Sequence, residues 1–313
     1  MPELAGKVAL VAGATRGAGR GIACMLGAAG ATVYCTGRSS RAGGATPGRP
    51  ETIEETAALV ASHGGQGIAL RVDHTVEAEV QGLFAQVARE QGRLDLLVND
   101  IWGGDPLTEW GKPFWELDVA QGLLMQQRAV HTHIMTGRHG VPLLLRGGRG
   151  LVVEITDGDS LVYRDNLFYD LAKISVIRLA HAMAHELRPR GVTALALTPG
   201  YLRSEAVLAH WGVTEADWRD GVARDPHFIA SETPYFVGRA VAALAADPQV
   251  ARKAGGLYSS WALAEEYGFD DVDGRRPHWG RYFAQHLAGL SQDGRPRDAA
   301  APPPWLLAPP VVD

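Results

Sequence analysis

A tyrosine and a lysine, four residues apart, carry the clearest chemistry in this sequence. Tyr169 and Lys173 stand at the start of residues 169–187, where the spacing of apolar residues predicts a helix. Because four residues make about one helical turn, both side chains lie on the same face. An ammonium group beside a phenol stabilises the phenolate and lowers the tyrosine pKa from about 10 toward neutrality. The pair therefore predicts an acid–base site in which Tyr169 exchanges a proton.

Lysine is rare in this chain, which makes Lys173 more informative. The 313 residues contain 30 basic side chains, only four of them lysines, and arginine holds its proton too firmly to serve the same purpose. With 35 acidic side chains the formal net charge is −5, which argues against nucleic acid or an acidic membrane as a partner. Two cysteines provide no disulfide framework, and neither a signal peptide nor a membrane span is expected, so the sequence predicts a cytoplasmic protein.

Three glycines form a second group with chemical meaning. Gly13, Gly17 and Gly19 follow an apolar run at residues 8–12 and precede a helical pattern at residues 20–29. Small residues at such a point let backbone N–H groups approach a pyrophosphate at the helix N-terminus. A second strand is expected at residues 32–36. Strand, glycine loop, helix and strand together predict a unit that binds a nicotinamide dinucleotide.

The residues after the second strand bear on which dinucleotide is bound. Proteins that bind NAD usually place a carboxylate there for the ribose hydroxyls. This strand instead ends in residues 36–39, with Arg38 and no carboxylate. Arg38, and Arg16 within the glycine loop, carry the planar set of donors that suits a 2′-phosphate. We therefore expect NADP(H) as the cofactor.

Strands and helices alternate along the chain, and they must bring these residues together. The alternation predicts an α/β fold: a single Rossmann-type doubly wound sheet of about seven parallel strands with helices on both faces. We expect one domain over residues 1–290, a substrate loop near residues 201–234 and a Pro/Ala-rich tail at residues 291–313 outside the core. Helices are expected at residues 20–29, 52–63, 77–91, 114–137, 169–187 and 235–246, and the later strands at residues 68–72, 94–98, 150–155, 192–197 and 256–260.

The two motifs, in this order, resemble the short-chain dehydrogenase/reductase family. Its glycine segment TGxxxGxG appears at residues 12–19, with Thr15 inside it, and its YxxxK motif is Tyr169 and Lys173. Residues 83–97 and 267–277 are further similar to the member 1 branch of that family. The resemblance implies reduction of a small-molecule carbonyl substrate by NADPH, and a homodimer or homotetramer. It also implies cofactor contacts at Asp73, Asn99, Pro199, Gly200 and Ser204.

The sequence departs from the family where a serine normally donates a hydrogen bond to the substrate carbonyl. Counting back from Tyr169 gives Thr156, counting from the end of the fifth strand gives Asp157, and Ser160 is a third candidate. Threonine donates as serine does. An ionised aspartate cannot donate, although a protonated one can. The alternatives therefore stay open between Thr156, a protonated Asp157 and no direct replacement.

Other positions also differ from the family pattern. Gly122 falls where the family has an asparagine, with Gln121 as a possible substitute. Trp102 replaces a small residue and either narrows the substrate pocket or fills the core. These changes leave an alternative function open, a non-catalytic NADP-binding sensor or scaffold. No metal is expected, because the pair formed by His181 and His185 has no third ligand.

Overall fold

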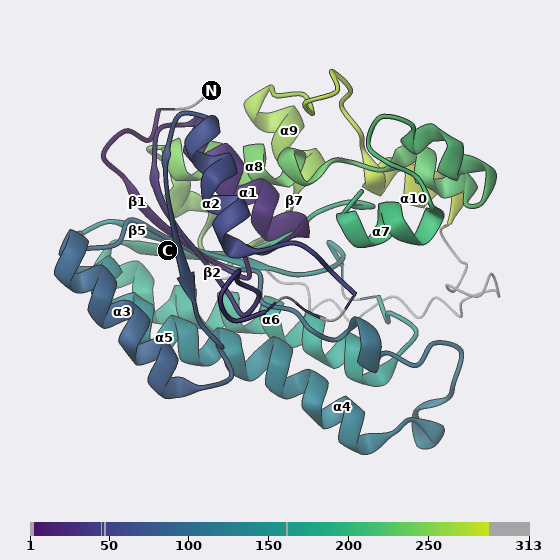
Figure 1. Ribbon diagram of the computed structural model, residues 1–313, viewed down its shortest axis with the longest axis horizontal. Helices are drawn as coiled ribbons and strands as arrows, with labels where there is room; N and C mark the ends of the chain where they lie inside the picture. The colour runs from purple at the N-terminus through teal and green to yellow at the C-terminus, as the bar shows by residue number, and fades with distance from the viewer. Residues whose placement is uncertain (1–2, 45, 47, 161, 288–313) are drawn as a thin grey trace.

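Seven parallel strands form one sheet, as the sequence predicts, in the order β3-β2-β1-β4-β5-β6-β7. The computed structural model describes residues 3–44, 46, 48–160 and 162–287 (Figure 1). The five inner strands are almost wholly buried, as expected of strands covered on both faces, whereas β3 and β7 at the two edges of the sheet are only partly buried. The strands are β1 (Val8–Ala12), β2 (Thr32–Gly37), β3 (Gln66–Arg71), β4 (Leu96–Asn99), β5 (Gly150–Ile155), β6 (Val192–Thr198) and β7 (Leu257–Ser259).

Helices cover both faces of the sheet (Figure 1). The alternation within β1 shows the two cores: Ala9 and Val11 pack toward one layer of helices, Val8 and Leu10 toward the other. One layer consists of α1 (Gly17–Ala28), α2 (Ile53–Ser62) and α8 (Pro234–Ala246). The other consists of α3 (Glu77–Gln91), α5 (Thr132–Arg146) and α6 (Leu167–Leu187), with α4 (Val119–Gln126) packed against α6.

The strand order reverses next to β1, and this reversal positions the candidate site. From β1 the chain runs outward to β2 and β3, then crosses back to β4 on the other side of β1. In such sheets ligands bind outside the carboxyl ends of the strands at the point of reversal. The glycine loop follows β1, Asn99 ends β4, and Thr156 follows β5 at this edge.

The expected helix over residues 114–137 is wrong in its bounds. A 3-10 turn at Phe114–Glu116 comes first, and α4 starts only at Val119, where the Asp118 side chain accepts hydrogen bonds from two backbone N–H groups. A π-helical segment, Gln127–His131, then joins α4 to α5, which continues to Arg146 despite an internal proline. Helix α4 therefore begins where a capping side chain satisfies its first N–H groups.

The segment after β6 is more ordered than its loop-rich sequence suggests. It contains α7 (Glu205–Trp211) and two 3-10 turns, Trp218–Ala223 and Pro226–Ala230. After β7, α9 (Ser260–Tyr267) and α10 (Trp279–His286) were not predicted. The tail expected at residues 291–313 lies outside the described residues. No helix in the described parts of the chain is long and apolar enough to cross a membrane.

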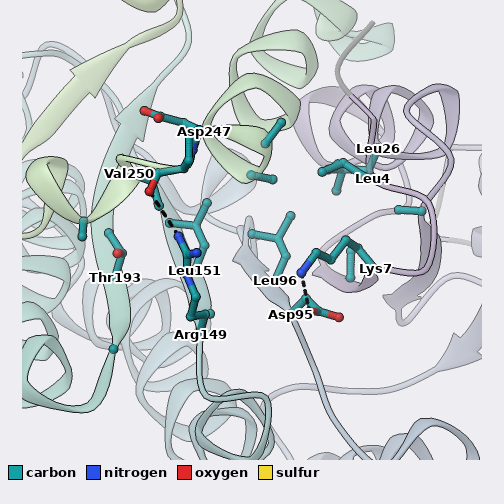
Figure 2. A pocket seen from close by; sticks show the side chains of 18 residues that line it. Leu4, Lys7, Leu26, Asp95, Leu96, Arg149, Leu151, Thr193, Asp247 and Val250 are labelled. Carbon is teal, nitrogen blue, oxygen red and sulfur yellow. Dashed lines mark hydrogen bonds and ion pairs between the residues drawn. The ribbon is translucent and has the colours of Figure 1, made fainter.

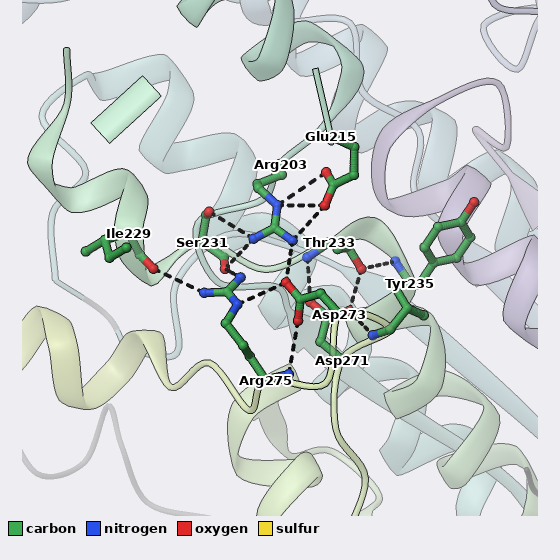
Figure 3. A network of polar contacts seen from close by, with 10 residues as sticks. Arg203, Glu215, Ile229, Ser231, Thr233, Tyr235, Asp271, Asp273 and Arg275 are labelled. Carbon is green, nitrogen blue, oxygen red and sulfur yellow. Dashed lines mark hydrogen bonds and ion pairs between the residues drawn. The ribbon is translucent and has the colours of Figure 1, made fainter. Parts of the chain in front are cut away.

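A buried arginine anchors this segment (Figure 3). Arg203 is 1% exposed, and its Nη2 lies 2.8 Å from Glu215 and 2.9 Å from Asp273. Its guanidinium also stacks on Trp218, 4.2 Å from the ring centre. Burying a guanidinium is costly unless charged partners surround it, so these contacts hold three separate stretches of chain together. Trp218 is accordingly a packing residue of the segment.

Close helix packing generates a stability prediction. A Cβ at Gly21 of α1 would lie 2.0 Å from the carbonyl oxygen of Pro234 in α8. We expect Gly21→Ala to lower the free energy of unfolding by about 1–3 kcal/mol, because the two helices must separate. Gly82→Ala is the matched control: it is also helical and meets nothing within 4 Å, so it should stabilise the protein by about 0.5–1 kcal/mol. Urea unfolding of both variants checks this, and equal effects would contradict it.

Candidate active site

The glycine loop is built for close backbone approach. Gly13 has φ +92°, and a Cβ there would lie 2.2 Å from the carbonyl oxygen of Asp100. A Cβ at Gly19 would lie 2.4 Å from the carbonyl oxygen of Gly13. Arg16, which precedes α1, makes no hydrogen bond from its side chain to the first turn of the helix. The loop therefore leaves backbone N–H groups of the first turn for an anion, which fits the diphosphate of a dinucleotide.

A carboxylate from a distant part of the chain already lies at this helix end. Glu205, the first residue of α7, accepts a hydrogen bond of 2.8 Å from the Gly17 N–H, and its other oxygen is 3.6 Å from Arg20 Nε. Ser204 precedes it, and its side chain caps α7 by accepting from the Val207 N–H. The carboxylate shows that this helix end does attract an anionic group. Sequence reasoning missed Glu205, because nothing local links it to the glycine loop.

The positive charge near β2 is partly neutralised by a carboxylate that the local sequence does not contain. Arg16 donates to Glu51 at 3.2 Å, and Arg49 lies 2.6 Å from the same carboxylate. The sequence around β2 shows no acid, but the chain returns after residue 50 and brings Glu51 to Arg16. Arg38 is exposed at the end of β2, so of the two expected arginines it is the freer one for a 2′-phosphate.

Asp73 lies close to this group. Burial raises the pKa of Asp73, but hydrogen bonds from Thr75 and the charges of Arg38 and Arg71 bring it below its ordinary value. A carboxylate held ionised in this way adds a fixed acceptor at the end of β3.

Tyr169 lies beside Asp157 rather than beside a serine-like hydroxyl. Tyr169 belongs to the first turn of α6, which Asn166 caps, and its hydroxyl donates to Asp157 Oδ2 at 2.8 Å. Thr156 points elsewhere: its hydroxyl donates to the Lys173 carbonyl oxygen at 2.8 Å. The Ser160 hydroxyl oxygen lies 3.5 Å from the Val162 N–H. Of the three candidate replacements, the structure places Asp157 next to the tyrosine.

This arrangement reverses the expected effect on the tyrosine. Burial, followed by the charge and hydrogen bond of Asp157, raises the pKa of Tyr169 well above its ordinary value. Burial also lowers the pKa of Lys173, against the opposing charges of Asp157, Asp100 and Asp105. Lys173 Nζ lies 5.3 Å from the centre of the Tyr169 ring. The expectation that Lys173 brings the Tyr169 pKa toward neutrality is therefore not met here, because Asp157 opposes the phenolate.

Two tryptophans enclose the pair. The Trp102 and Trp110 ring centres lie 5.4 and 5.2 Å from that of Tyr169. Lys173 Nζ lies 3.9 Å above the centre of the Trp102 ring, a cation–π contact. A Cβ at Gly104 would lie 2.4 Å from Trp102, so the glycine makes room for the indole. Trp102 thus belongs to the candidate site and does not merely fill the core.

The position expected to hold the family's asparagine has a different use. A Cβ at Gly122 of α4 would lie 2.2 Å from the ring of Phe168. Gln121 contacts Asp118 at the start of its own helix, at 3.4 Å. Gln126, one turn after Gly122, donates to the Phe168 carbonyl oxygen at 2.6 Å. The structure therefore ties α4 to the start of α6 through Gln126, a residue that the sequence did not single out.

A buried polar group supports the loop that carries Trp102. Asn99 donates to Glu154 at 2.7 Å, and His133 Nδ1 lies 2.5 Å from the other oxygen of that carboxylate. His133 Nε2 is 3.0 Å from the Ile101 carbonyl oxygen, directly before Trp102. All three side chains are buried. Asn99 thus links the ends of β4 and β5, and Pro199 and Gly200 follow β6 at the same edge.

Among the described residues, one cavity lies near the carboxyl ends of the strands and another near their amino ends. One, of about 560 Å³, includes Asp157, Ser160 and Arg164 on one side and Trp261, His278 and Trp279 on the other. The other, of about 280 Å³, lies at the amino ends of the strands, between Lys7, Asp95, Arg149 and Asp247 (Figure 2). Asp157, the hydrogen-bond partner of Tyr169, lines the first cavity, whereas none of the candidate site residues lines the second.

Comparisons with known proteins agree with this geometry. Residues 7–211 match the family model described as short chain dehydrogenase. The human and mouse proteins named dehydrogenase/reductase SDR family member 1 are 38% and 36% identical to this chain, over 86% of it and 84% of their own length. A short chain dehydrogenase from Mycobacterium thermoresistibile has the same fold, with a TM-score of 0.74 over 89% of this chain and 93% of that one, at 22% identity.

The contact between Asp157 and Tyr169 predicts a titration. Asp157→Ser should lower the pKa of Tyr169, because a neutral hydroxyl no longer opposes the phenolate, while burial should keep that pKa above about 10. The phenolate absorbance of Tyr169 is isolated as the difference between each protein and its own Tyr169→Phe variant, recorded against pH. An unchanged or higher pKa in Asp157→Ser would show that the carboxylate does not act on the tyrosine.

Proposed function

Because the chain belongs to the short chain dehydrogenase family, and is therefore an oxidoreductase, we propose that it reduces a carbonyl compound, an aldehyde or a ketone, with NADPH. Asp100 carries this proposal, because it connects the two motifs. Its backbone carbonyl oxygen lies so close to Gly13 that a Cβ there would be 2.2 Å away, and its carboxylate accepts a hydrogen bond from the Gly19 N–H. The same carboxylate acts electrostatically on Lys173, and burial raises its pKa to about 7. Asp100 thus links the glycine loop to the lysine of the Tyr–Lys pair, which supports one shared site for cofactor and proton transfer.

The residues present suit a phosphorylated dinucleotide. Gly13, Gly17 and Gly19 would hold the diphosphate at the N-terminus of α1, where the Glu205 carboxylate now lies. Arg38 would meet the 2′-phosphate, since Arg16 is already paired with Glu51. NADPH, when bound there, supplies the hydride.

The chain's own residues position the substrate and move the proton. Tyr169 gives its hydroxyl proton to the oxygen of the reduced carbonyl group, and the loss of its hydrogen bond to Asp157 frees that proton. Lys173 faces Asp100 and Asp157, so its ammonium group lies between the cofactor loop and the acid–base pair and would hold the ribose. Thr156 fixes the Lys173 backbone through its hydroxyl. Trp102 and Trp110 limit the access of water to the tyrosine.

Loss of the tyrosine hydroxyl tests the proposal. Tyr169→Phe should lower kcat/KM for NADPH consumption about 100-fold or more on an aldehyde and ketone panel, the size expected of a general acid. NADPH fluorescence should show unchanged cofactor binding in this variant. Binding of NADPH without turnover by the wild type on the whole panel would instead favour a non-catalytic sensor, in which Asp157 keeps the tyrosine proton.

The choice of cofactor gives a separate prediction. Arg38→Ala should weaken NADPH binding about tenfold or more while leaving NADH binding unchanged, because only NADPH carries the 2′-phosphate. Arg93→Ala is the matched control, since Arg93 pairs with Asp95 at the opposite edge of the sheet. Equal weakening of both dinucleotides in Arg38→Ala would count against the assigned role.

A further inference from the structure

We propose that this site reduces protonated C=N bonds, those of imines and iminium ions, in preference to neutral carbonyl groups. The inference rests on the proposed hydride transfer and names the substrate class for which the described side chains are best arranged.

The first argument concerns hydrogen bonding beside the tyrosine. The Tyr169 hydroxyl donates a hydrogen bond to Asp157 Oδ2, 2.8 Å away. The free lone pairs of both the carboxylate and the phenol oxygen therefore face the substrate. A carbonyl oxygen offers only lone pairs in return, so neither of these two oxygens donates to it. The N–H of a protonated imine is a charged donor, which pairs with a carboxylate in a charge-assisted hydrogen bond.

The second argument concerns the aromatic walls. The Trp102 ring already holds a cation, the Lys173 ammonium, 3.9 Å from its centre. Trp110 is 46% exposed, and its ring lies 5.2 Å from that of Tyr169, so part of its surface is open next to the tyrosine. Aromatic faces attract ammonium and iminium groups but gain nothing comparable from a neutral carbonyl.

The third argument concerns the balance of charge. The charges that act on Lys173 are those of Asp157, Asp100 and Asp105, against the single guanidinium of Arg164. Arg164 is itself paired with Asp170 at 3.1 Å. Asp105 accepts a hydrogen bond from the Trp102 indole, so its carboxylate stays at the aromatic wall. Asp157 and Asp105, joined by Asp100 in its ionised form, outnumber the Lys173 ammonium, so the site can accept a second cation.

The reaction also needs less from the protein than carbonyl reduction does. The hydride adds to the carbon of the C=N bond, and the π electrons become the lone pair of the amine nitrogen. The oxidised cofactor carries away the positive charge, and the N–H proton stays on nitrogen. No proton leaves Tyr169, so the hydrogen bond to Asp157 persists throughout. An alkoxide, by contrast, would form next to a carboxylate and need the tyrosine proton.

Paired substrates of equal ring size test the inference. The enzyme is given NADPH and one of two compounds. The imine is methylpyrroline, which is largely protonated at neutral pH, and the ketone is cyclopentanone. We expect kcat/KM to be about tenfold or more higher for the imine, the size of one charge-assisted hydrogen bond. Asp157→Ser should reverse this preference, because serine donates to a carbonyl oxygen. Asp247→Ser, which removes a similar bond to Tyr267 at the opposite edge of the sheet, should leave it unchanged.

Binding gives a readout that does not depend on turnover. Pyrrolidinium should bind to the NADP⁺-loaded protein about tenfold or more tightly than neutral tetrahydrofuran, and Asp157→Ser should lose the difference. Calorimetry measures both, and NADPH fluorescence shows that the variant is folded. Equal binding of the two rings, or turnover of the ketone without the imine, overturns this inference and leaves the proposed function standing. Turnover of neither compound overturns both.

Discussion

The hydrogen bond from Tyr169 to Asp157 sets the chemistry that this site can perform. Together with burial, the Asp157 carboxylate raises the pKa of Tyr169. The bond also leaves acceptors where the family usually presents a donor, and it sets the charge that a substrate meets. The surrounding contacts maintain it. Asn166 caps the helix that carries Tyr169, and Arg164 holds the Asp157 backbone through a 2.7 Å hydrogen bond to its carbonyl oxygen. Exchanging the aspartate for a serine would therefore alter proton transfer and substrate choice together.

The fold brings this pair to the cofactor loop through the reversal of strand order beside β1. Parallel strands present their carboxyl ends at one edge, so the glycine loop, Asn99 and Thr156 meet there although they are far apart in sequence. Asp100 joins the two halves, because it contacts the glycine loop and acts on Lys173. The buried His133–Glu154 contact sits beneath this edge and fixes the Ile101 carbonyl oxygen.

Local patterns in the sequence predicted the strands well, because the five inner strands are buried on both faces and appear as largely apolar runs. The position of the glycine loop followed from its spacing together with the strands and helix around it, and that of the Tyr169–Lys173 helix from its apolar pattern. What could not be predicted depends on pairs that are distant in the chain. Glu51 reaches Arg16 across 35 residues, and Glu205 reaches Gly17 across 188. The choice between Thr156 and Asp157 needed side-chain directions, which counting cannot supply. Cytoplasmic location and a homodimer or homotetramer stay predictions.

A crystal structure of the NADP⁺ complex tests the central claim most directly, that the glycine loop and Tyr169 form one hydride-transfer site. The account predicts the diphosphate at the Gly17 N–H, with Glu205 displaced from it. It also predicts the nicotinamide ring next to Lys173, with its reactive carbon about 3–4 Å from a substrate position that touches both Tyr169 and Asp157. A nicotinamide ring directed away from Tyr169, or a dinucleotide bound elsewhere while Glu205 keeps its place, would contradict the account.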